Sequence, residues 1–267
     1  MCIKFLNTGK KGLSEEDYYI ITPGQANTGF IKLIKTLPKI DISNYTSLEN
    51  FCKDMTGLET IPVLNTSNVK SINAMFQNCA SLTTVPLFDT SKVTTFQNAF
   101  ANCSSLVSIP EFNTSNVTIF DTTFYNCTSL ETLPLLDTSK ATNLYQFLMR
   151  TKIDTLPALN TALVTNAGYM CQECSELVNV PVLNLASLVS ANNMFKTCDA
   201  LSNDSLNNIM ESLISAVKMS ATNKKLSTIG LSETQAQTCT TLSNYQAFLA
   251  AGWKTGYASI DNPTEGA

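Results

Sequence analysis

The stretch Met75-Phe-Gln-Asn-Cys-Ala-Ser-Leu-Thr-Thr-Val-Pro-Leu-Phe-Asp-Thr-Ser-Lys-Val-Thr94 decides the fold. It recurs along the chain with small changes, and its proline marks the interval between copies. These prolines are 24, 24, 24, 24, 23 and 24 residues apart, at Pro38, Pro62, Pro86, Pro110, Pro134, Pro157 and Pro181. A fixed period of this length is the sequence signature of a repeat architecture.

Apolar residues hold fixed places around each proline. In the quoted copy, Leu82 lies four residues before it and Val85 immediately before it. This short, partly β-branched run is bounded by turn residues, so we expect a strand of about three to five residues. The Asp-Thr-Ser that follows is turn chemistry. Val93, Phe96 and Phe100 then recur at helical spacing and predict one or two helical turns.

One such unit is too small to bury its own apolar stripe, whereas stacked copies form continuous internal columns. We therefore expect an α/β solenoid of units of about 24 residues, with short parallel strands and short helical turns. The copy around Arg150 lacks its cysteine and one residue, so we expect the column to bulge there.

The quoted stretch resembles the leucine-rich repeats of the bacterial surface-protein (BspA-like) type. It is most similar to the variant found in mycoplasma surface lipoproteins and in proteins of gut bacteria and their phages. The resemblance covers roughly Ile34 to Leu201. It implies a leucine-rich-repeat stack that serves as a general binding scaffold.

The chain divides into three parts. Residues 1–33 are expected to form an N-terminal cap or docking segment, 34–201 the repeats, and 202–267 an α-helical capping region and tail. In the last part, Asn203 opens an amphipathic helix, 226–231 restates a strand, and 242–251 offers a final helix. The buried face of the first helix is expected to hold Leu206, Ile209, Met210, Leu213, Ile214 and Val217.

Composition excludes several classes of function. The net charge is -4, which argues against nucleic-acid binding. The chain has no histidine, which removes Ser-His-Asp and Cys-His catalysis and histidine-ligated metals. No apolar run is long enough to insert into a membrane, and the N-terminus is too polar for a secretory signal. We expect no enzyme activity and no cofactor.

The cysteines follow the repeat. Cys79, Cys103 and Cys127 are 24 residues apart, which favours small buried thiols over disulfides, because stacked Cβ atoms point in parallel. Cys171 and Cys174 form a Cys-x-x-Cys, which alone suggests redox or zinc chemistry. In the repeat register, however, Cys174 holds the ordinary cysteine place and Cys171 replaces a phenylalanine.

The exposed side of the expected strands is the candidate binding face, defined by the residues between the internal places. Extended surfaces of repeat proteins bind partners, although the same positions can simply keep the protein in solution. The candidate residues are Glu59, Thr60, Thr83, Thr84, Leu87, Val107, Ser108, Glu111, Glu131, Thr132, Leu135, Asp154, Thr155 and Asn179.

These observations favour a non-enzymatic component of a phage virion, assembled in the bacterial cytoplasm: a tail fibre, a receptor-binding protein or a capsid decoration. The segment 242–257 is similar to the ends of phage tail proteins and gut bacterial repeat proteins. The partner is then a protein or glycan receptor, or a neighbouring virion protein, and homo-oligomers remain open. The alternative is a BspA-like adhesin on the bacterial cell surface that binds host proteins.

Overall fold

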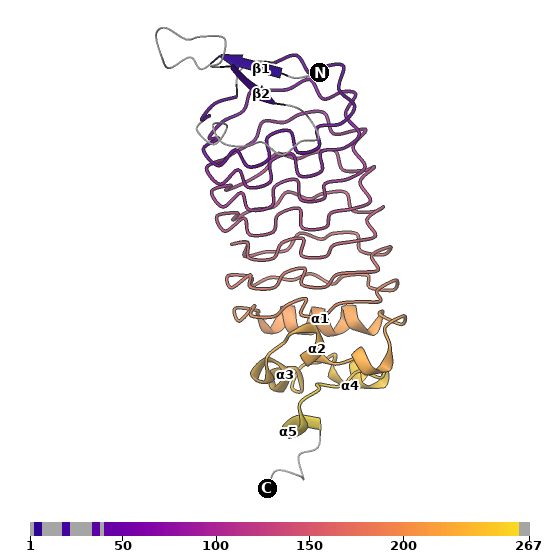
Figure 1. Ribbon diagram of the computed structural model, residues 1–267. Coiled ribbons are helices and arrows are strands. Elements are labelled where there is room, and N and C mark those ends of the chain that lie inside the picture. Colours follow the sequence, from indigo (N-terminus) through magenta and orange to yellow (C-terminus); the bar gives the residue numbers. More distant parts are fainter. Residues whose placement is uncertain (1–2, 7–17, 22–33, 38–39, 262–267) are drawn as a thin grey trace.

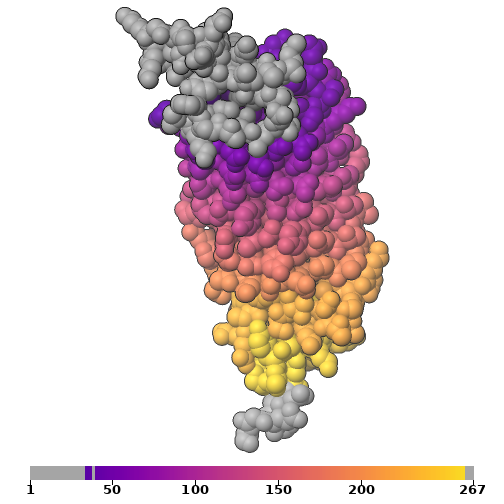
Figure 2. All heavy atoms as spheres, in the orientation of Figure 1, coloured from indigo at the N-terminus to yellow at the C-terminus, as the bar shows by residue number. Residues whose placement is uncertain are grey.

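The computed structural model describes residues 3–6, 18–21, 34–37 and 40–261. From residue 40 to about 201 the backbone winds in successive coils laid one on the next, and helices close the C-terminal end (Figure 1). In the space-filling view the colour bands cross the long axis in sequence order (Figure 2). Each stretch of chain therefore packs against the stretch one coil away.

Equivalent residues of neighbouring coils meet each other, as the period predicts. One column of single-residue parallel bridges runs through the stack without a break, and its steps are 24 residues except for one of 23. It joins Ser47, Ser71, Thr95, Ile119, Asn143, Asn166 and Ser190.

The predicted α/β solenoid of parallel strands and helical turns is nevertheless wrong. In the described residues between 34 and 201 there is neither a strand nor a helix. Where strands were expected, pairing is reduced to the isolated bridges Thr36–Thr60 and Thr155–Asn179. The Thr60 N–H donates to the Lys35 carbonyl (3.1 Å), but the next donor in that register is Pro62. Because proline has no N–H, the ladder stops after one step.

The predicted helical turns are also absent, because alternate amides bond outside their own coil. The N–H groups of Phe96, Asn98 and Phe100 donate to carbonyls of the next coil, each at 3.0 Å. Only the amides between them, such as that of Ala99 to Phe96, close tight turns within the coil (2.9 Å). An α-helix would need every N–H to donate four residues back.

Two left-handed residues per coil also prevent a helix. In the coil of the quoted stretch they are Ala74 (φ 53°) and Asn78 (φ 66°), and in the next coil Asn98 (φ 55°) and Asn102 (φ 63°). Asparagine tolerates this conformation better than most residues with a Cβ. The asparagine before each repeat cysteine therefore marks a sharp bend.

The core is a set of stacked side-chain columns. Rings of the phenylalanine column lie nearly parallel at centroid distances of 5.5 Å (Phe76–Phe100) and 5.6 Å (Phe100–Phe124). Cys52 and Cys171 take the same place in their coils and are buried like the rings. Burial of these columns is the main favourable term in holding the coils together.

Helix α1 (Asn203–Ile214) begins where the sequence predicts it, with the Ser202 side chain accepting from the Ser205 N–H. Leu206, Ile209, Met210 and Leu213 are buried, Ile214 is half-buried, and Val217 is exposed, contrary to expectation. Serines of this segment close the stack, since Ser205 and Ser212 hydroxyls accept from the Val180 and Leu183 amides (2.7 and 2.8 Å).

The strand expected at 226–231 is instead helix α2 (Leu226–Ile229). Its carbonyls take the place of a further coil, because Asn193 and Phe195 donate to Thr228 and Ile229 (2.8 and 2.9 Å). The helix ends at Gly230 (φ 93°), where a Cβ would lie 2.6 Å from the Lys196 nitrogen. Only glycine fits that contact and that backbone angle.

The remaining elements are short. They are the 3-10 helix η3 (Ala221–Asn223), α3 (Glu233–Cys239), α4 (Tyr245–Ala250) in the segment expected to be helical, and α5 (Ala258–Asp261). In the described part of the chain no helix has the length and apolar character needed to cross a membrane.

Strands β1 (Ile3–Leu6) and β2 (Tyr18–Ile21) pair antiparallel and lie at the N-terminal end of the stack (Figure 1). The other residues of the expected N-terminal cap, 1–33, lie outside the described residues. The same holds for the end of the expected tail, 262–267.

Candidate functional site

The predicted binding face is exposed. Backbone hydrogen bonds join it from coil to coil, from Val107 to Thr83 (3.1 Å) and from Glu131 to Val107 (3.2 Å). Ser108 is half-buried, and the other predicted residues are exposed: Glu59, Thr60, Thr83, Thr84, Leu87, Val107, Glu111, Glu131, Thr132, Leu135, Asp154, Thr155 and Asn179.

A row of apolar side chains runs along this face, one residue after each proline. Val63, Leu87, Leu135 and Val182 are 70%, 59%, 59% and 46% exposed. Glu111 and Ala158 hold the same position in two coils and interrupt the row. Val63 and Val182 are outside the predicted residue set, although their position after the proline is a signal that could have included them. We call these four side chains the apolar row.

The charges of the face are partly neutralised by ion pairs between coils. Lys35 lies 2.8 Å from Glu59, and Lys152 lies 2.8 Å from Glu131. Hydrogen bonding to these carboxylates raises the pKa of both lysines. The face therefore offers hydroxyl and apolar groups with little net field, which suits contact with another macromolecule better than capture of a free ion.

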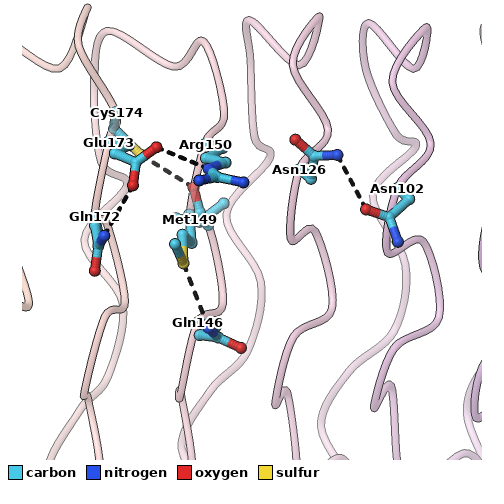
Figure 3. Close-up of polar contacts among 9 residues, drawn as sticks. Asn102, Asn126, Gln146, Met149, Arg150, Gln172, Glu173 and Cys174 are labelled. Atoms are coloured by element: carbon cyan, nitrogen blue, oxygen red, sulfur yellow. Dashed lines mark hydrogen bonds and ion pairs between the residues drawn. The ribbon is translucent and has the colours of Figure 1, made fainter.

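A second column of polar side chains occupies the left-handed bend before each cysteine. Asn78 donates to Asp54 (2.6 Å), Asn102 to Asn78 (2.8 Å) and Asn126 to Asn102 (3.0 Å). Figure 3 shows Asn126 and Asn102 pointing toward one another from adjacent coils. This amide ladder is structural, because each side chain is used by the next coil.

The ladder changes character at Arg150, which holds the asparagine place in its coil. Its Nε donates to a Glu173 carboxylate oxygen at 2.7 Å, and Gln172 donates to the other oxygen at 2.8 Å (Figure 3). The hydrogen bond from Arg150 is the main cause that holds the pKa of Glu173 below its usual value. An exposed ion pair thus replaces the amide ladder.

An open hollow of about 420 Å³ lies beside this ion pair. It sits where the coil is one residue short, between Thr151 and Ile153. The expected bulge does not form, since Leu144 and Arg150 keep their backbone bonds to the next coil, both at 2.9 Å. The hollow is lined by Thr128, Arg150, Thr151, Lys152, Glu173, Ser175 and Glu176.

The cysteines serve packing. The described cysteines are free and buried, and the thiol of Cys103 donates to the Phe76 carbonyl one coil away (3.1 Å). Burial raises the pKa of Cys103 to about 12. Cys171 is also buried, and its pKa is raised by a hydrogen bond with Cys174 and by desolvation. Thiols that stay protonated are poor nucleophiles.

No group of three or more candidate metal-ligating side chains is found within the described part of the chain. The arrangement of the site thus rests on exposed side chains and one hollow rather than on a reactive cluster.

Comparison with known proteins gives one family. A family model described as "Mycoplasma protein of unknown function, DUF285" matches the chain twice, over residues 46–155 and 107–211. Neither a curated protein nor a solved structure gives a significant match. The two matched ranges overlap and together cover the coils and the start of α1.

Proposed function

From the premise that this chain belongs to the DUF285 family of mycoplasma proteins, we propose that it is a non-enzymatic binding or structural protein that docks another macromolecule on its exposed face. The finer assignment, to the BspA-like repeat proteins, is part of the same proposal and rests on the stretch 75–94. The partner is a protein or a glycan.

The apolar row is the observation that carries this proposal. Side chains such as Val63 and Leu87, 70% and 59% exposed, contribute little to folding where they stand. A row of them along one face, between threonines, is a feature of interaction surfaces. The absence of histidine and the protonated state of the buried thiols support a passive role.

Two settings fit such a docking protein. The first is a phage virion, as a tail fibre, receptor-binding protein or capsid decoration, supported by the resemblance of segment 242–257. The second is a bacterial surface adhesin of the BspA-like type, supported by the family's description from mycoplasma, which are cells. Purified virions and intact bacterial cells, probed with the same antibody, distinguish the two settings.

The docking role is tested by binding to arrays of glycans and of host extracellular proteins. Substitution of Leu87 and Leu135 by serine should abolish any signal that the unaltered protein gives. The matched control replaces Leu163 and Val189, which are 51% and 54% exposed but lie outside the face, and should leave the signal unchanged. Equal loss in both variants, or no signal on either array, contradicts the proposal.

A further inference from the structure

One coil departs from the repeat in three ways at the same place. Arg150 replaces the asparagine of the ladder, Thr151 replaces the cysteine, and one residue is missing before Ile153. The backbone bonds to the next coil persist, for example from Arg150 N–H to the Gln172 carbonyl at 2.9 Å. The departures therefore alter the surface and leave the stacking intact.

Their combined result is the hollow lined by Arg150, Lys152, Glu173 and Glu176, with hydroxyls from Thr128, Thr151 and Ser175. Its volume of about 420 Å³ falls within the range of sites for small molecules. It shares none of its lining residues with the predicted binding face.

The hollow is rich in hydrogen-bonding groups that are not fully used. The Nε of Arg150 donates to Glu173, and a guanidinium has five N–H donors in all. The Lys152 ammonium donates to Glu131 at 2.8 Å, and an ammonium has three donors. The carboxylate of Glu176 and the Ser175 hydroxyl, both exposed, add acceptors nearby.

The charges select the class of ligand. Two cations and two carboxylates line the hollow, so it has no net charge to attract a free anion or a metal ion. Donors and acceptors alternate at short range, and adjacent hydroxyl groups of a sugar ring both donate and accept. We propose that this hollow is a binding site for a neutral saccharide, held by Arg150 and Lys152 as donors and by Glu173 and Glu176 as acceptors.

This inference goes beyond the docking function and does not need it, because the two surfaces are altered by different substitutions. The probes are glucose, galactose, mannose, N-acetylglucosamine and their neutral disaccharides, with glucuronate and inorganic phosphate for comparison. Titration calorimetry and saturation-transfer NMR on the full chain should give dissociation constants on the order of 1 mM for at least one neutral sugar, as expected for a small open site.

Three variants test the residues. Arg150→Asn restores the repeat, Glu173→Gln removes a carboxylate, and one serine inserted between Lys152 and Ile153 restores the full coil. Each should weaken saccharide binding about 10-fold or more, the loss expected for a hydrogen bond to a charged group. Glu59→Gln, which breaks the equally exposed ion pair to Lys35, is the matched control and should bind normally.

Thermal unfolding of each variant shows whether it is folded, and the two point substitutions provide the test if the insertion does not fold. Three results overturn the proposal: no neutral sugar binds, glucuronate or phosphate binds more tightly than every neutral sugar, or binding survives in the folded Arg150→Asn and Glu173→Gln variants. Loss of the docking signal in the leucine variants, with saccharide binding unchanged, leaves the proposal standing.

Discussion

The left-handed bend at Asn102 gives a sharp prediction about what shapes the coil. Its φ is 63°, and its amide donates to Asn78 (2.8 Å) and accepts from Asn126 (3.0 Å). Asn102→Ala and Asn102→Gly both lose these two bonds, which costs about 0.5–1.5 kcal/mol each. The alanine variant must also hold a Cβ in the left-handed region, which costs a further ~1–2 kcal/mol. The glycine variant should therefore be the more stable of the two.

The control position is Asn116, whose φ is not positive, although its side chain also bonds the neighbouring coil, at the Ser91 carbonyl (2.8 Å). There the order should reverse, and alanine should be more stable than glycine by about 0.4–1 kcal/mol. Urea unfolding followed by circular dichroism measures all four variants. If alanine is the more stable variant at both positions, the bend does not constrain the coil and the reasoning fails.

Two further predictions concern the core. Phe100→Ala removes the middle ring of the Phe76–Phe100–Phe124 column, and urea unfolding should show a loss of about 3–5 kcal/mol; a loss below 1 kcal/mol would mean that the column is not packed. Burial raises the pKa of Cys103 and of Cys239 from 9.0 to about 12, so the unfolded chain loses these protons first as pH rises. The unfolding free energy should therefore fall between about pH 9 and 12, by about 1.4 kcal/mol per pH unit for each thiol, and Cys103→Ala should reduce that slope in urea titrations. An equal slope in the variant would show that the Cys103 thiol is not buried.

The sequence predicts the stacking because its period is a global property. The proline spacing places Ser71 against Thr95 whatever the local backbone does. The start of α1 was also predictable, because Ser202 is a strong N-cap ahead of an amphipathic pattern.

The local conformation was mispredicted for reasons that lie in single residues. The run from Leu58 to Pro62 has strand propensity, but Pro62 removes the donor that a second ladder step needs. The run around Phe96 has helical spacing, but the left-handed Asn98 and Asn102 redirect alternate amides to the next coil. Periodicity cannot distinguish a helix from bends that repeat every four residues.

The candidate site divides in the same way. Exposure of the binding face follows from the internal places of the repeat, so residues such as Thr84 and Leu135 could be placed from the sequence. The hollow beside Arg150 could not, because a missing residue predicts an irregularity but not whether it bulges or opens a cavity.

Distances between spin labels on one column test the stacking of coils most directly. Lys70, Thr142, Thr165 and Val189 lie on the surface at equivalent positions, and Thr94, Thr142 and Thr165 each donate their backbone N–H to the residue one coil earlier. With Cys2 replaced by serine and one label fixed at position 70, the second is moved to 142, 165 and 189. Neighbouring chain segments lie about 4.8 Å apart, so electron–electron resonance should give distances that grow by about 5 Å per coil, near 14, 19 and 24 Å. Distances that do not increase in equal steps, or that exceed about 40 Å, would contradict the stack of coils.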